Sequence, residues 1–179
     1  MTLTNLWQSS LLWTLNQLST EPVRLAIVGI GNELRGDDAA GVAVVRRLAQ
    51  ELALQNQKNV LVVEGGNAPE NHTGPIRRFA PHLVLLVDMA QMDREPGSVC
   101  WLPWQETSGL SASSHTMPPY MLARFLTTDM GCDVALIGIQ PLDTSLTREM
   151  TAVVETAVAS VAAEITHIVQ TFYADPSAD

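Results

Sequence analysis

Four short, continuously apolar runs constrain the fold more than any other feature of this chain. Each run is rich in valine, leucine and isoleucine, and each ends at a glycine or a charged residue. A strand that is apolar at every position is covered on both faces, as in a parallel sheet enclosed by helices. The four predicted strands are Leu25–Ile30, Val60–Glu64, Leu83–Asp88 and Val134–Ile139.

Segments with helical spacing lie between these runs. They are predicted over Asp38 to about Gln55, Pro118 to about Met130 and Thr147 to about Phe172, with a shorter helix or irregular crossover at 69–78. Ser98–Leu102 follows Pro-Gly and is predicted to be an additional strand, with an antiparallel place at a sheet edge as one option. Alternating strands and helices predict an α/β fold with a mainly parallel sheet of about five strands and helices on both faces.

The N-terminal segment has apolar residues at helical spacing, among them Trp7, Leu11 and Leu15. We predict an amphipathic helix that packs on the domain or on a partner. The expected organisation is one domain over 1–179, with a helical extension at 1–22, a core at 23–172 and a frayed tail at 173–179. No stretch was expected to be long and apolar enough to span a bilayer.

The formal net charge of −9, without a run of Lys or Arg, argues against binding to nucleic acid or to an anionic membrane surface. Cys100 and Cys132 form no CxxC pattern, so we predict free thiols in a reducing cytoplasm. A monomer is expected because no heptad pattern or long apolar surface strand is present.

Ligand sites of parallel α/β folds form beyond the carboxyl ends of the strands, which directs attention to the loop after Ile30. This loop is rich in glycine, but its spacing is G-x-G-x-x-x-x-G rather than the dinucleotide-binding G-x-G-x-x-G. Asp37 and Asp38 also stand at the helix N-terminus, where they would repel a pyrophosphate. Helix capping is the simplest role for either aspartate, but one suffices for that role, which leaves the other free to point elsewhere.

Asp88 ends a predicted strand, and His115 lies in a small polar loop before a predicted helix. A turn role for Asp88 and a surface position for His115 are the plain alternatives. Asp38, Asp88 and His115 together form a plausible three-ligand site for a borderline divalent ion. In the first loop, Asn32, Gly36 and Asp37 are predicted to bind the substrate.

Five motifs in register resemble the hydrogenase maturation endopeptidase family. The Ala-Pro-Glu-Asn and His-Thr-Met-Pro segments are most similar to the branch that processes the large subunit of hydrogenase 3, the formate hydrogenlyase type. Ala39 departs from the glycine usual in the family, and a small geometric change is expected there. The motifs are Gly31-Asn32 with Gly36-Asp37-Asp38, then 64–71 (EGGNAPEN), Val87-Asp88, 114–118 (SHTMP) and 138–141 (GIQP).

The resemblance implies a three-layer α/β/α endopeptidase that removes a C-terminal extension from a nickel-loaded NiFe hydrogenase large-subunit precursor. It places the metal contacts at Asp38, Asp88 and His115 and the catalytic role at Asp38 and Asp88. Two mechanisms stay open: the metal polarises the scissile carbonyl, or Asp38 and Asp88 activate water as acid and base. The metal is expected to be nickel presented by the substrate, and no organic cofactor is expected. Two alternatives stay open from the residues: a metal-dependent chaperone that binds the precursor without cutting it, and a small-molecule hydrolase.

Overall fold

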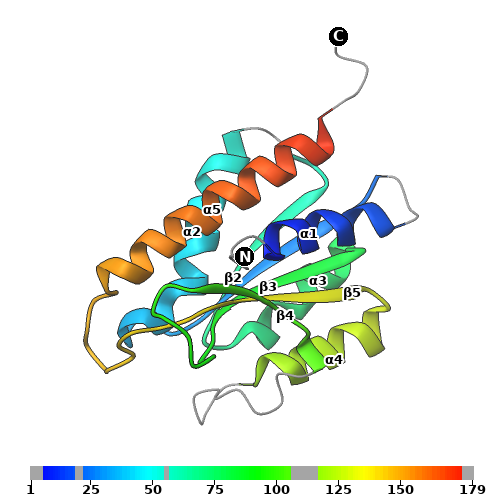
Figure 1. Cartoon of the computed structure of the whole chain (residues 1–179). Coiled ribbons are helices and arrows are strands. Elements are labelled where there is room, and N and C mark those ends of the chain that lie inside the picture. Colours follow the sequence, from blue (N-terminus) through cyan, green and yellow to red (C-terminus); the bar gives the residue numbers. More distant parts are fainter. Residues whose placement is uncertain (1–5, 19–21, 55–56, 106–116, 175–179) are drawn as a thin grey trace.

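A five-stranded sheet forms the centre of the molecule (Figure 1). The computed structural model describes residues 6–18, 22–54, 57–105 and 117–174. The strand order is β2-β1-β3-β5-β4; β4 runs antiparallel to β5, and the other neighbouring strands pair in parallel. The mainly parallel sheet with an antiparallel edge strand is thereby confirmed. The strands are β1 (Leu25–Ile30), β2 (Val60–Gly66), β3 (Leu83–Met89), β4 (Val99–Leu102) and β5 (Asp133–Ile139).

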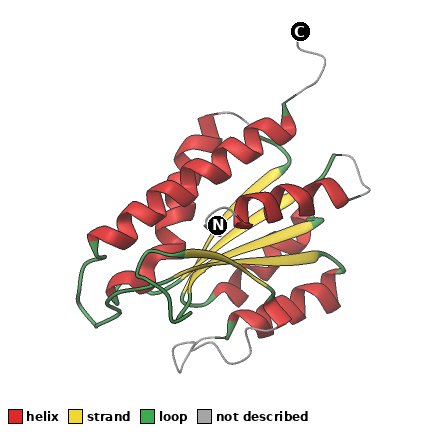
Figure 2. Cartoon of the chain, in the orientation of Figure 1, coloured by secondary structure: helices red, strands yellow, loops and turns green. Residues whose placement is uncertain are grey.

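Helices cover both faces of the sheet, which gives the predicted three layers (Figure 2). The helices on one face are α1 (Leu6–Gln17), α2 (Ala40–Leu54) and α5 (Ala152–Tyr173). Those on the other face are α3 (Thr73–Phe79) and α4 (Pro119–Met130). Two short 3-10 helices, η1 (Gly36–Ala39) and η2 (Pro69–His72), precede α2 and α3.

The central strands contribute alternate side chains to the two apolar cores. In β3, Leu85 and Val87 lie in the core beneath α2 and α5, whereas Val84 and Leu86 lie in the core beneath α3 and α4. All of these side chains are fully buried. Continuous apolarity in the sequence is thus explained by burial on both faces of the sheet.

Helix α1 packs on the domain rather than standing apart from it. Trp7, Leu11 and Leu15 follow one another at intervals of four residues, and all three are buried in the core shared with α2 and α5. Trp13, on the same helix, is exposed. The extension predicted from the sequence therefore contributes a face to the main core.

Helix α5 corrects one expectation from the sequence. Within the described residues it is the one helix that is long and apolar enough, by length and composition, to cross a membrane. Half of the apolar window is buried inside the protein, where Val158, Val161 and Ile165 face the core. This burial is the pattern of a core helix.

Two helix boundaries differ from the prediction. The segment from Asp38 begins as the 3-10 helix η1, and regular α-helix starts at Ala40. Helix α5 begins at Ala152 rather than at Thr147, because residues 140–151 form an irregular loop in which Thr147 has a positive φ of 61°. This loop is held by contacts with the first loop, described below.

The packing of α1 can be tested with two neighbouring leucines. Leu11 has no exposed surface, whereas 39% of Leu12 is exposed. We expect Leu11→Ala to lower the free energy of unfolding by about 2–5 kcal/mol, because it removes buried methyl groups and leaves a cavity. The control Leu12→Ala should cost less than about 1 kcal/mol. Equal effects in urea denaturation would contradict the integration of α1 into the core.

Candidate active site

The first loop and the start of α2 sit tightly on the carboxyl ends of β1 and β3. A Cβ added at Gly41 would lie 2.1 Å from the backbone oxygen of Val87 and 2.4 Å from that of Ile30. Only glycine permits this approach, since real Cβ atoms essentially never come within 3.0 Å of other atoms. The approach brings η1, and with it Asp38, to the end of the strand that carries Asp88.

Asp38 and Asp88 form a pair of interacting carboxyl groups. Burial, together with repulsion by the nearby Asp38 and against a smaller lowering by the Met89 backbone N–H, raises the pKa of Asp88 to about 8. Burial also raises the pKa of Asp38, while Arg35 and the Asn32 backbone N–H oppose that shift. Two neighbouring carboxyl groups that are shielded from solvent and repel each other favour a bound proton or a bound cation between them. The sequence placed both residues at strand carboxyl ends, and the structure brings them together.

The buried Asp37 carboxylate is held inside the protein. It has no exposed surface, and its Oδ2 accepts hydrogen bonds from the backbone N–H groups of Leu142 at 2.8 Å and Asp143 at 2.9 Å. Its Oδ1 accepts the Thr151 N–H at 2.7 Å, and the Thr151 hydroxyl lies 3.0 Å from both carboxylate oxygens. Asp37 is therefore a positioning residue that fastens the loop 140–151 to the first loop. Neither helix capping nor a substrate contact through this carboxylate fits the observed bonds.

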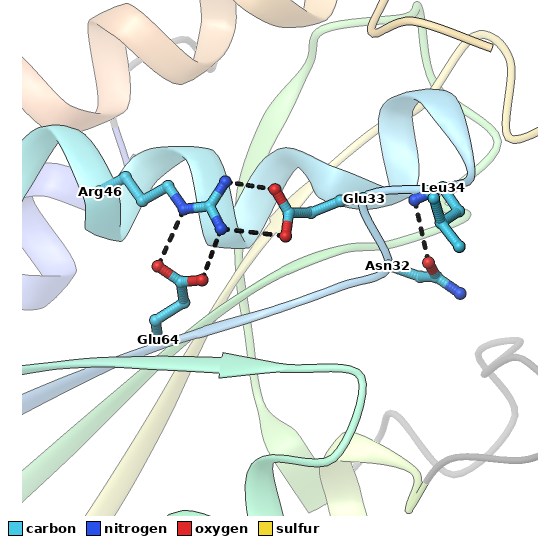
Figure 3. A network of polar contacts seen from close by, with 5 residues as sticks. All are labelled: Asn32, Glu33, Leu34, Arg46 and Glu64. Carbon is cyan, nitrogen blue, oxygen red and sulfur yellow. Dashed lines mark hydrogen bonds and ion pairs between the residues drawn. The ribbon is translucent and has the colours of Figure 1, made fainter. Parts of the chain in front are cut away.

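Gly36 and Asn32 shape the same loop. Gly36 is buried with a φ of 53°, and a Cβ there would meet the backbone oxygen of Asp143 at 2.6 Å. Its N–H donates to the carbonyl of Arg148 at 3.1 Å. The Asn32 side-chain oxygen accepts the Leu34 N–H at 3.0 Å (Figure 3). Both residues give the loop its form; the predicted substrate contacts of Asn32 and Gly36 stay predictions.

His115 lies outside the described residues, as does the whole segment 106–116. Within the described ranges no group of three or more His, Cys, Asp or Glu side chains is arranged to hold a metal ion. The Asp38–Asp88 pair supplies two oxygen donors of the kind that divalent cations accept. The proposed third ligand stays a prediction from the sequence.

An arginine that the sequence analysis missed links the first loop to β2 (Figure 3). Arg46 on α2 donates from Nε and Nη2 to the two carboxylate oxygens of Glu64, at 2.8 and 2.6 Å, and from Nη1 and Nη2 to both oxygens of Glu33. All three side chains are about half exposed, so this network orients the loop more than it stabilises the fold. The carboxylate of Glu64, near the carboxyl end of β2, is therefore bound to Arg46.

Gln140 organises the loop that follows Asp88. Its side chain is buried, and its Oε1 accepts the Met92 N–H at 2.7 Å. Its backbone carbonyl accepts the Gly97 N–H at 2.8 Å. The sequence contained this residue in the GIQP motif, but no local pattern indicated its partners. The loops after β1, β3 and β5 are thus fastened to one another around the acid pair.

Comparison with known proteins identifies the family. The family model for hydrogenase maturation protease matches residues 42–168. This chain belongs to the hydrogenase maturation protease family. It is accordingly a hydrolase, an endopeptidase, and the resemblance seen in its motifs is confirmed. The peptidase hypothesis is therefore retained over the chaperone and the small-molecule hydrolase.

Relatives of known sequence and structure agree with this assignment. The hydrogenase 3 maturation protease of Escherichia coli K12 is 33% identical over 133 residues, which cover 74% of this chain and 82% of that protein. A putative hydrogenase maturation protease of Methanocaldococcus jannaschii is 34% identical over 122 residues, 66% of this chain and 72% of the relative. The crystal structure of a NiFe hydrogenase maturation protease from Thermococcus kodakarensis KOD1 superposes with a TM-score of 0.77 at 32% identity, covering 88% of this chain and 99% of that one.

The raised pKa of Asp88 predicts how stability depends on pH in the metal-free protein. Between pH 4 and pH 8 the unfolded chain loses this proton while the folded chain keeps it, so the folded state loses stability as pH rises. Asp88→Asn removes this loss. With a chelator present, we expect the mutant to gain on the order of 1 kcal/mol or more over the native protein between pH 5 and pH 8.

The matched control for this measurement is Asp143→Asn. Hydrogen bonds from Ser145 lower the pKa of Asp143, so its contribution is already complete above pH 4 and is lost only in more acidic solution. The free energy of unfolding of this control should differ from that of the native protein by the same amount at every pH from 5 to 8. A constant difference for Asp88→Asn as well would show that Asp88 titrates as an ordinary carboxyl group.

Proposed function

We propose that this protein removes the C-terminal extension of a NiFe hydrogenase large-subunit precursor, and that it acts on the precursor after nickel has been inserted. The observation that carries the proposal is the Asp38–Asp88 pair, enclosed by the loops at the carboxyl ends of β1 and β3. Family membership supplies the reaction class, and the resemblance of the motifs to the hydrogenase 3 branch indicates the substrate.

The pair has the properties needed for acid–base hydrolysis of a peptide bond. Near neutral pH, burial and mutual repulsion keep Asp88 protonated, because its pKa is about 8. The second carboxyl group, Asp38, is positioned to accept a proton from an attacking water. Peptide hydrolysis needs one group that takes a proton from water and one that donates a proton to the leaving amine, and paired carboxyl groups of unequal pKa provide both.

Nickel enters this proposal as part of the substrate. Two carboxylates and an imidazole suit a borderline divalent cation, and three ligands leave coordination positions for groups of the precursor. Asp38, Asp88 and His115 would then contact nickel that the precursor already holds. The enzyme acts in the cytoplasm, as a monomer without a membrane partner.

Purified protein should therefore be incubated with nickel-loaded and nickel-free precursor, and the C-terminus followed by mass spectrometry. We expect cleavage of the loaded precursor only, because the unloaded one lacks the group that Asp38, Asp88 and His115 recognise. Asp38→Asn and Asp88→Asn should each slow processing by at least about 100-fold, as expected when an acid–base group is lost. His115→Ala should slow processing as well, because it removes a contact to nickel.

The control for these variants is Asp129→Asn. Asp129 is an acid of α4 that pairs with Arg77, away from the loops that hold the candidate site. It should process the precursor at the native rate. Equal cleavage of loaded and unloaded precursor would refute nickel recognition, and native-rate processing by the Asp38 and Asp88 variants would refute the assigned acids.

A further inference from the structure

Three of the most exposed apolar side chains of the described residues lie on two loops beside the acid pair. The exposed fractions are 67% for Leu34, 61% for Leu142 and 60% for Leu146. Of the other large apolar side chains described, only Trp13 on α1, at 65%, is exposed to this degree. Exposed apolar groups that are concentrated in one region mark interaction sites more often than single exposed leucines do.

The backbones of the two loops are joined directly. The Thr147 N–H donates to the Leu34 carbonyl at 2.7 Å, which places Leu34 next to Leu146 along the joined segments. Two further backbone bonds run from Gly36 to Arg148 and from Asp37 to Asp143. Leu34, Leu142 and Leu146 therefore lie exposed on two loops that are bonded to each other; we refer to these three residues as the leucine rim.

The leucine rim is held rigid from inside. The buried Asp37 carboxylate accepts the Leu142 N–H directly and binds Asp143 and Thr151 on either side of Leu146. An irregular loop fastened in this way keeps its backbone in place before a partner arrives. Binding to a loop that is already ordered costs less conformational entropy than binding that must order the loop.

The position of the rim indicates what it binds. Leu34 lies four residues before Asp38, and Leu142 and Leu146 follow β5, whose Gly138 is paired in register with Asp88. A protein substrate seated at the acid pair would therefore lie beside these loops. None of the three leucines lines the cavities beside His82, Trp104 or Tyr173. Projecting apolar anchors fit recesses on a folded protein better than they fit a small molecule.

We propose that the leucine rim docks an apolar surface of the folded hydrogenase large-subunit precursor, apart from the peptide that is cut. This inference rests on the proposed function, because it takes the precursor as the substrate. Two surfaces would then select the precursor. The acid pair recognises the metal and the scissile region, and the leucine rim binds the folded body of the precursor.

The test uses the triple variant Leu34→Ser, Leu142→Ser, Leu146→Ser in the full chain. Binding to purified nickel-loaded precursor is measured by biolayer interferometry in the Asp88→Asn background, so that no cleavage occurs. We expect the triple variant to bind at least ten-fold more weakly, with no change in Tm, since the three side chains are exposed. In the enzyme that keeps its native Asp88, the same three substitutions should raise the KM for cleavage. Trp13→Ser, equally exposed on α1, is the control and should bind as the parent does.

The outcomes separate this inference from the proposed function. If the native enzyme does not cleave the precursor, both the proposed function and the docking surface are refuted. If the native enzyme cleaves but the triple variant binds the precursor with unchanged Kd, only the docking surface is refuted. The alternative partner of the rim is a second copy of this chain, which sedimentation of the enzyme alone tests. The proposal is overturned if the native enzyme is a dimer, the triple variant is a monomer, and both bind the precursor equally well.

Discussion

The loops at the carboxyl ends of the strands, which form the candidate site, depend on one buried carboxylate, that of Asp37. Its oxygens accept hydrogen bonds from the backbone of Leu142, Asp143 and Thr151, and the residue itself has no exposed surface. A buried charge is costly unless its oxygens are fully bonded, so these donors and the carboxylate require each other. The same bonds fasten the loop after β5 to the loop after β1. Without them the loop 140–151 has neither helix nor strand to define its course.

The neighbouring residue, Asp38, is held in position by the loop contacts that Asp37 makes. Adjacent residues point in different directions in η1, so one carboxyl group is fixed in the interior while the next faces Asp88. Gly41 lets this turn rest on the ends of β1 and β3, and Gln140 fixes the chain that leaves Asp88. The paired acids thus owe their raised pKa values to a site assembled from three separate loops.

Much of this arrangement could be predicted from the sequence, and the part that could not has a physical reason. Continuous apolar runs identified the strands of the parallel sheet, and the carboxyl-end rule placed Asp38 and Asp88 at one edge. The role of Asp37 was missed because its partners lie 105 to 114 residues further along the chain, and no local pattern encodes them. Arg46 was missed because an exposed arginine on a helix gives no sign of which carboxylates it meets.

The central claim is that Asp38 and Asp88 form one coupled acid site, and the pKa of Asp88 tests it most directly. It can be measured by carbon-13 NMR of the side-chain carboxyl groups in metal-free protein, with Asp88→Asn to assign the signal. We predict a pKa of about 8 for Asp88, and a lower pKa in the Asp38→Asn variant because the repulsion is removed. A pKa near the ordinary value of about 4, unchanged by Asp38→Asn, would contradict the claim.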